Sequence, residues 1–133
     1  MINFISILEQ NPNGVLATNE GEKIKTRIFQ YLFAEGNKIY FCTNTKKPVY
    51  NQLKNNPNVS FCTNLQHYTP VLSLYGKAVF VDDMNLKEKA ISENPGIKNI
   101  YGNASNPVFT LFYIDVKEID TFSYDEGPKQ YIL

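Results

Sequence analysis

The alternation of hydrophobic and polar residues along the chain predicts short strands and helices joined by tight turns. Helical spacing of apolar residues marks the helices, period-two alternation marks the strands, and Gly, Pro and Asn clusters separate them. In chain order, we expect a helix over residues 2–10, a hairpin of strands 15–18 and 23–33, a strand 38–44, a helix 46–55, strands 58–64 and 71–81, a helix 86–93, an irregular stretch to 107 with one turn near 97–101, and strands 108–116 and 118–124 before a polar tail.

Local signals support several of these boundaries. Thr45 and Pro48 suit the start of a helix, and Asp82 and Asp83 can cap the helix that follows them. Gly76 in the middle of a long strand indicates a bulge or a close backbone approach. About seven strands joined mostly by short turns are typical of a closed or nearly closed antiparallel barrel. The sequence therefore predicts a mainly β protein with two or three short helices at the ends of the barrel.

Composition narrows the class of protein. The chain has 133 residues, of which 43% are hydrophobic, so we expect residues 1–133 to form one domain. Thirteen basic residues balance thirteen acidic ones, which argues against a partner of nucleic acid or anionic membrane. The apolar run 71–81 is interrupted by polar residues, the N-terminus lacks a signal-peptide pattern, and there are only two cysteines. These features predict a cytoplasmic protein.

Few residues offer catalytic chemistry of their own. His67 is the single histidine, and Cys42 and Cys62 lack the spacing of a metal site, so we expect no metal. His67 lies in a polar loop, where a solvated residue is more common than a general base. Cys42 could be a reactive thiol near Lys46, although a buried strand residue is the commoner role. No phosphate-binding glycine loop and no nucleophile elbow occur. The catalytic residues therefore stay unknown.

One segment does suggest ligand binding. Residues 43–48 join a predicted strand to a predicted helix, and they bring hydroxyls, two ammonium groups and exposed backbone N–H groups together. A solvated lysine pair at a helix start is the plainer interpretation of this stretch alone. Arg27, the only arginine beside twelve lysines, changes the balance, because its planar fork makes paired hydrogen bonds that lysine cannot make. We expect the strand that carries Arg27 to run beside strand 38–44.

Three segments carry a resemblance to a known family. They are residues 26–29 (TRIF), residues 39–59 (IYFCTNTKKPVYNQLKNNPNV) and residues 72–78 (LSLYGKA). Together they resemble the pyridoxamine-phosphate-oxidase-like FMN-binding split barrels, and within that family the nitroimidazole-resistance (Nim-type) and flavin-nucleotide-binding proteins. The resemblance covers residues 1 to about 124, with a moderately specific block at residues 41–59.

The resemblance implies an antiparallel split β-barrel of Greek-key type, FMN as the cofactor, and a homodimer with the flavin at its interface. It implies six cofactor-binding residues: Arg27 facing the flavin phosphate or pyrimidine edge, Ile28 and Phe29 giving backbone contacts to the ring, Thr43 bonding the phosphate, and Lys46 and Lys47 neutralising it. The oxidase carries a Ser-Arg-Lys-like cluster where this chain has residues 47–49 (KPV), and the Arg-x-His-type substrate segment is missing. Oxidation of vitamin B6 is therefore disfavoured.

Two functions remain from different classes. The first is an oxidoreductase in which FMN is the redox centre for a small molecule and the protein supplies anchoring and orientation. The second is a non-catalytic carrier or binding module for flavin or haem with the same fold. The sequence does not choose between NADH and NADPH, or between FMN and a deazaflavin.

Overall fold

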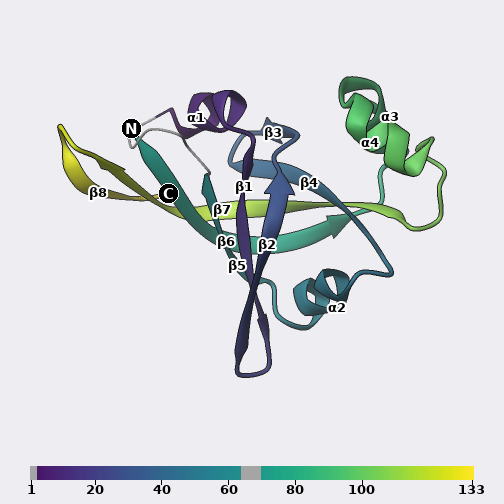
Figure 1. The fold of residues 1–133 in the computed structure, drawn as a ribbon, viewed down its shortest axis with the longest axis horizontal. Helices are drawn as coiled ribbons and strands as arrows, with labels where there is room; N and C mark the ends of the chain where they lie inside the picture. The colour runs from purple at the N-terminus through teal and green to yellow at the C-terminus, as the bar shows by residue number, and fades with distance from the viewer. Residues whose placement is uncertain (1–2, 64–69) are drawn as a thin grey trace.

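A computed structural model describes residues 3–63 and 70–133. Figure 1 shows a twisted sheet with a long hairpin projecting from its body and helices placed around it. The helices are α1 (Phe4–Gln10), α2 (Pro48–Asn55), α3 (Met84–Glu93) and α4 (Pro95–Tyr101). The strands are β1 (Asn13–Glu20), β2 (Lys23–Gln30), β3 (Phe33–Glu35), β4 (Lys38–Asn44), β5 (Asn58–Thr63), β6 (Val71–Val81), β7 (Phe109–Ser123) and β8 (Gly127–Ile132).

The strands form one antiparallel sheet in the order β2-β1-β5-β6-β7-β4-β3, with β8 added beside β7. Its two outer strands, β2 and β3, are not paired with each other. On the inner side of the sheet, the ring of Phe29 in β2 packs edge-on against Phe41 of β4 and Phe112 of β7, at centroid distances of 6.1 and 5.6 Å. The expected antiparallel split barrel is confirmed: the sheet curls round, and an apolar seam joins the outer strand β2 to β4 and β7.

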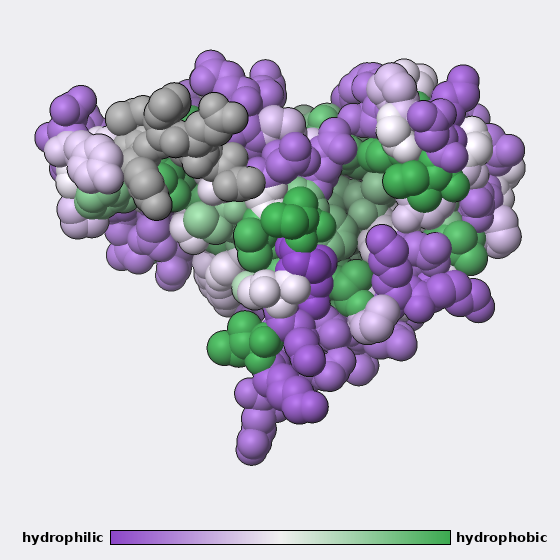
Figure 2. All heavy atoms as spheres, in the orientation of Figure 1, coloured by the Kyte–Doolittle hydropathy of each residue, from purple (hydrophilic) through white to green (hydrophobic). Residues whose placement is uncertain are grey.

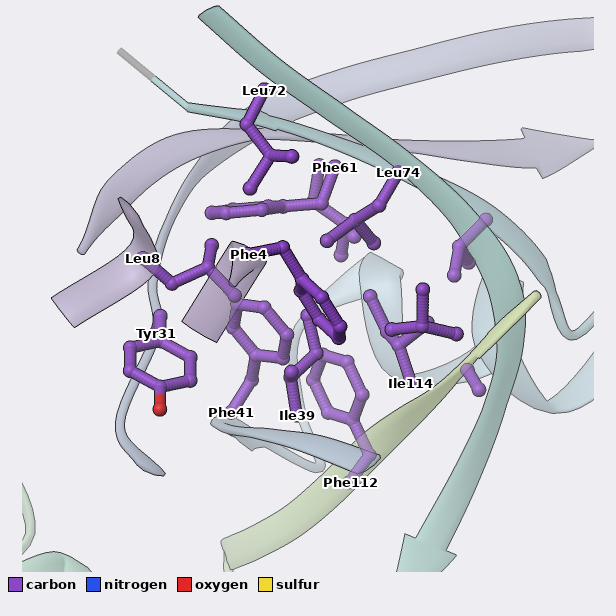
Figure 3. Close-up of a cluster of buried hydrophobic side chains, with 14 of the residues drawn as sticks. Phe4, Leu8, Tyr31, Ile39, Phe41, Phe61, Leu72, Leu74, Phe112 and Ile114 are labelled. Atoms are coloured by element: carbon purple, nitrogen blue, oxygen red, sulfur yellow. The ribbon is translucent and has the colours of Figure 1, made fainter. Parts of the chain in front are cut away.

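Aromatic side chains fill the interior of the barrel. Phe41, Phe61 and Phe112 are fully buried, and Figure 3 shows their rings close together between aliphatic side chains of neighbouring strands and of α1. Phe41 lies 5.0 Å from Phe61 and 5.4 Å from Phe112, centroid to centroid. Burying one phenylalanine side chain contributes about 1.5–3 kcal/mol. This cluster therefore anchors both sides of the barrel seam.

A second apolar cluster covers the other face of β4. Tyr40 points away from the barrel interior and stacks on Phe33 at 5.0 Å. The pair α3 and α4 closes this cluster with Ala90, Ile91 and Ile97. β4 thus lies between two apolar layers, as its nearly continuous burial shows. Within the described residues, no helix is long and apolar enough to cross a membrane.

Several sequence expectations about the C-terminal half are wrong. β7 is one strand of 15 residues where two strands, 108–116 and 118–124, were expected. Its length follows from its partners, because β7 pairs along most of its length with β6 and in succession with β4 and β8 on its other side. The expected polar tail forms β8, and the expected single turn near 97–101 is the helix α4. Tertiary pairing outweighs the weak local signals of these polar segments.

Other boundaries agree with the sequence. Gly76 marks a register shift between β6 and β7, and a side chain there would collide with the backbone of Asp115. Asp83 caps α3 through hydrogen bonds from the backbone N–H groups of Asn85 and Leu86. The N-cap of α2 is Lys47 rather than Thr45, and no side chain caps this helix. The expected strand 23–33 divides into β2 and β3 at residues 31 and 32.

Candidate ligand site at the hairpin and helix α2

The β1–β2 hairpin and the N-terminus of α2 enclose a hollow of about 580 Å³. Figure 1 shows α2 beside the projecting hairpin, next to the body of the sheet. We call this cavity the hairpin hollow. Its lining combines charged and polar side chains with two apolar ones: Glu20, Lys25, Thr26, Arg27, Lys47, Pro48, Val49 and Gln52.

Arg27 is half-buried on the wall of the hairpin hollow, held by three hydrogen bonds. Its Nη1 donates to the backbone oxygen of Leu16 at 3.2 Å and to Thr18 Oγ1 at 2.8 Å. Its Nη2 donates to Gln52 Oε1 at 2.6 Å. Arg27 therefore connects its own hairpin with α2, and its guanidinium has a defined orientation.

Gln52 is the centre of this polar network. Only 5% of the residue is exposed, although it carries an amide on a helix that otherwise buries apolar side chains. Its Oε1 accepts from Arg27 and also from Thr18 Oγ1, at 2.6 Å, and its Nε2 donates to Glu20 Oε2 at 2.9 Å. The contacts distinguish the two ends of the amide, because the oxygen faces two donors and the nitrogen faces a carboxylate.

The electrostatics of the hairpin hollow favour an anion. Lys25, Arg27 and Lys47 bring three cationic groups to its lining, against the single carboxylate of Glu20. Burial lowers the pKa of Arg27, while the charge of Glu20 partly offsets this effect. A guanidinium keeps its proton in proteins nonetheless. Arg27 therefore acts as a fixed positive charge beside the ligand space.

The prediction that the strand carrying Arg27 runs beside strand 38–44 is wrong. β2 pairs only with β1, with Arg27 opposite Leu16, and β4 pairs with β3 and β7. The turn at residues 21–22 folds β2 back on β1, and the hairpin projects beyond the sheet (Figure 1). Arg27 and Lys47 still line the same hollow, because α2 extends beside the hairpin and carries Lys47 there.

The four other predicted site residues do not line the hairpin hollow. Lys46 is exposed, and its backbone N–H binds Asn44 Oδ1 at 2.8 Å. Ile28 is 62% exposed on the outer face of the hairpin, and Phe29 packs into the barrel seam. Among the predicted residues, the structure thus brings Arg27 and Lys47 together around one cavity.

Thr43 lies in the interior of the barrel, where 2% of the residue is exposed. It shares the inner face of β4 with Phe41. Its Oγ1 is buried and has no hydrogen-bond partner among the described residues. A buried hydroxyl without a partner costs free energy, of the order of 1–3 kcal/mol. Thr43 therefore retains an unused donor and acceptor in the interior of the barrel.

The two cysteines do not form a reactive centre. Burial raises the pKa of the Cys42 thiol to about 12, despite the opposing influence of Lys47. Burial also raises the pKa of Cys62. Both are free thiols, and no group of metal-ligating side chains occurs in the described part of the chain. His67 lies outside the described residues.

Sequence reasoning missed Gln52 and its partners Thr18 and Glu20. Gln52 lies between Val49 and Leu53 on the buried side of α2, so a polar residue at an apolar position was the available signal. It also missed Lys25, although alternation along a strand places Lys25 and Arg27 on one face of β2. Glu20 carries no such signal, because a charged residue beside a turn is ordinary.

The hairpin hollow fits a phosphate-bearing ligand with a planar ring. Its volume lies within the range of about 300–1,000 Å³ that is usual for cofactor sites. The cationic side chains suit a phosphate, and Pro48 and Val49 provide apolar lining for a ring. In addition, Arg27 has five N–H donors and uses three of them within the described residues. Two donors therefore remain for a ligand.

Solved structures with the same fold include flavin- and haem-binding proteins. A NimC/NimA family protein from Clostridium acetobutylicum is 25% identical and superimposes with a TM-score of 0.86, over 98% of this chain and 90% of that one. A pyridoxamine 5'-phosphate oxidase-related, FMN-binding protein from Nostoc punctiforme is 13% identical, with a TM-score of 0.72, over 100% and 97% of the two chains. A haem-binding protein from Mycobacterium smegmatis is 15% identical, with a TM-score of 0.75, over 95% and 55%.

No curated protein is similar enough in sequence to count as a match. The profile of the pyridoxamine 5'-phosphate oxidase family, in contrast, matches residues 4–123, from the start of α1 to the end of β7. This range includes the whole lining of the hairpin hollow. The chain belongs to the pyridoxamine 5'-phosphate oxidase family of split barrels.

Proposed function

We propose that this protein binds FMN in the hairpin hollow and is an oxidoreductase that acts on a small molecule, with FMN as its redox centre. The observation that carries the proposal is the meeting of the only arginine with Lys47 on the lining of one hollow that suits a flavin nucleotide. An FMN-binding protein of the same fold supports the choice of cofactor. Residues 1–133 form one FMN-binding domain in this proposal.

The sequence predicts six cofactor-binding residues, of which Arg27 and Lys47 line the hairpin hollow. Arg27 binds the phosphate or the pyrimidine edge of the ring through its two remaining N–H donors, and Lys47 neutralises the phosphate from the N-terminus of α2. Lys46 adds a second positive charge beside it. Thr43 lies inside the barrel and off the lining of the hairpin hollow, so the contact between its buried hydroxyl and the phosphate stays a prediction. Ile28 and Phe29 give backbone contacts to the ring.

The protein functions as a homodimer with the flavin at the interface in this proposal. The outer face of β2 supports it, because Ile24 and Ile28 are 75% and 62% exposed there. Figure 2 shows apolar surface over the β1–β2 hairpin, among hydrophilic residues. Exposed apolar side chains beside a ligand site are typical of a surface that a second subunit covers.

FMN supplies hydride or electron transfer when it is bound, which agrees with the scarcity of acid–base side chains. The residues of this chain bind the phosphate, orient the ring and limit access of water. The half-buried free thiols Cys42 and Cys62 suit a reducing compartment, and we place the protein in the cytoplasm.

A second candidate function is a non-catalytic carrier of flavin or haem. The haem-binding protein from Mycobacterium smegmatis has the same fold, which supports this alternative. It requires no substrate site beside the cofactor. Within the part of the chain that the structure describes, no histidine is available as a haem ligand.

The visible spectrum of the purified protein tests these functions. We expect a flavin absorption band that stays with the protein on gel filtration and bleaches with NADH or NADPH under anaerobic conditions, with dithionite as the control for complete reduction. A band that only dithionite bleaches would favour the flavin carrier, and a Soret band would favour the haem carrier. A protein that retains neither cofactor after incubation with each would contradict the proposal.

A further inference from the structure

The buried amide of Gln52 has a function that burial alone does not explain. An apolar side chain at this position would pack against the hairpin without requiring hydrogen bonds. Gln52 instead contacts the only arginine of the chain, a buried threonine and an acidic residue, at 2.6, 2.6 and 2.9 Å. The hydrogen bonds therefore fix the orientation of the Gln52 amide where α2 meets the hairpin.

Donor counting shows which edge of Arg27 the network occupies. A guanidinium has five N–H donors in one plane. Nη1 uses both of its hydrogens, on Leu16 and Thr18, and Nη2 uses one, on Gln52. The acceptors Thr18 Oγ1 and Gln52 Oε1 are only 2.6 Å apart, so they face the terminal edge between Nη1 and Nη2. The Nε–H and the second Nη2–H remain, and they form the lateral edge.

Glu20 keeps the amide of Gln52 in the orientation that this arrangement needs. A rotated amide would point its NH₂ group at the guanidinium and at the Thr18 hydroxyl, and its oxygen at the carboxylate of Glu20. The observed orientation places the Nε2 donor 2.9 Å from Glu20 Oε2. Because Glu20 lies at the exposed end of β1, it fixes the amide from the rim of the hairpin hollow.

We propose that Gln52 is a positioning residue, which holds the terminal edge of the Arg27 guanidinium so that its lateral N–H pair is presented to the ligand. The proposal rests on the proposed binding of FMN in the hairpin hollow. Paired N–H groups in a fixed plane suit two adjacent acceptors, such as two phosphate oxygens or the carbonyl–nitrogen edge of a flavin pyrimidine. Gln52 itself does not need to touch FMN.

Nuclear magnetic resonance tests the positioning without a ligand. Because Arg27 is the only arginine, its Nε–H gives a single cross-peak in a ¹⁵N-labelled sample. We expect slow guanidinium rotation, with separate Nη signals, in the wild type and in the double variant Gln52→Glu/Glu20→Gln, which keeps an acceptor oxygen at position 52 and supplies the amide donor from position 20. Gln52→Met, which fills a similar volume without an acceptor, is expected to give averaged signals. Asn51→Ala, an exposed neighbour on α2, is the matched control. Separate signals in Gln52→Met would overturn the proposal.

Ligand titration then connects positioning to binding. We expect Gln52→Met to bind FMN about tenfold more weakly than the wild type and Asn51→Ala, with an unchanged circular dichroism spectrum. An equal loss for riboflavin would assign the lateral edge to the ring, and a loss for FMN alone would assign it to the phosphate. Unchanged affinity in Gln52→Met overturns the positioning role but leaves the proposed function. A wild-type protein with a rigid guanidinium and no affinity for FMN contradicts the proposed function instead.

Discussion

Helix α2 and the helix pair α3–α4 cover different parts of the same sheet in different ways. The α3–α4 pair buries Ala90, Ile91 and Ile97 against the second apolar cluster. α2 also buries apolar residues, Val49 and Leu53, but places the amide of Gln52 between them and the hairpin. The first region is packed mainly by apolar side chains, supplemented by an exposed hydrogen bond and by a lysine over a phenylalanine ring. The second region contains a satisfied polar network that reaches a cavity.

We interpret this difference as that between a structural contact, at α3–α4, and a binding site, at α2. A buried polar group is unfavourable unless its hydrogen bonds are complete, and an apolar residue often gives equal or higher stability. The mainly apolar packing of α3–α4 shows that a helix can be held against this sheet without a buried polar network. We therefore interpret the network at α2 as a feature that serves a ligand, and each of the following changes affects one side of the comparison.

The largest expected effect is on stability, in the α3–α4 region. Ile97→Ala removes a side chain that is 7% exposed, and a buried Ile→Ala change usually costs about 2–5 kcal/mol. We expect chemical denaturation to show this loss. FMN affinity of the folded protein should stay at the wild-type value, and a marked loss of affinity would mean that the ligand lies near α3–α4.

The next largest effect is on ligand affinity, at Arg27. Arg27→Lys keeps the positive charge and loses the planar fork. Charge-assisted hydrogen bonds of this kind contribute about 1.5–3 kcal/mol, so FMN affinity should fall roughly ten- to a hundredfold. Fluorescence titration measures the change, and Lys23→Arg, which adds a fork on the same strand face but off the lining of the hollow, serves as the control. Wild-type affinity in Arg27→Lys would return Arg27 to a purely structural role.

Lys47 and Lys46 offer a closer test of the binding site, because the two residues are adjacent in the chain but differ in their position relative to the hollow. Lys47 lines the hairpin hollow and Lys46 does not. We expect Lys47→Ala to weaken FMN binding about fivefold, or ~1 kcal/mol, and Lys46→Ala to have a smaller effect. The double substitution should remove most of the preference for FMN over riboflavin and leave the fold intact, since exposed charges contribute little to stability. If Lys46→Ala loses more FMN affinity than Lys47→Ala, the phosphate lies nearer to Lys46 than we propose.

A further expected effect is the response of stability to alkaline pH. Burial raises the pKa of Cys42 from an ordinary 9.0 to about 12, and the pKa of Tyr31 from 10.0 to about 12. The folded state thus disfavours ionisation, so the stabilisation is complete below about pH 9 and is lost as the pH rises toward 12. We expect the melting temperature of Cys42→Ala to fall less steeply between pH 9 and 11 than that of the wild type. Equal slopes would contradict the assigned burial of the thiol.

The sequence contained most of the fold but only part of the site. Period-two alternation, turn residues and the signals at Gly76 and Asp83 reflect local physics, which explains their agreement with the structure. β8 and the uninterrupted β7 depend on pairing between distant strands, and no local signal carries that information. For the same reason, the prediction that the Arg27 strand runs beside β4 is wrong.

The site shows the same division. Arg27 and Lys47 attracted notice by residue type and by position at a helix start, and they do line one cavity. Gln52 and Thr18 reach Arg27 from segments 25 and 9 residues away in the chain. Hydrogen bonds between distant segments follow from the packing of α2 against the hairpin. Residue type and position therefore identify the two cationic residues of the site, whereas their hydrogen-bond partners can be identified only from the tertiary structure.

Parallel titration of the wild-type protein with FMN and riboflavin tests the central claim most directly. The two ligands share one ring system and differ in the phosphate, which the cationic lining of the hairpin hollow is expected to recognise. We expect FMN to bind at least about tenfold more tightly than riboflavin, and FAD to bind more weakly than FMN. Equal affinity for FMN and riboflavin would contradict a phosphate site at Arg27 and Lys47.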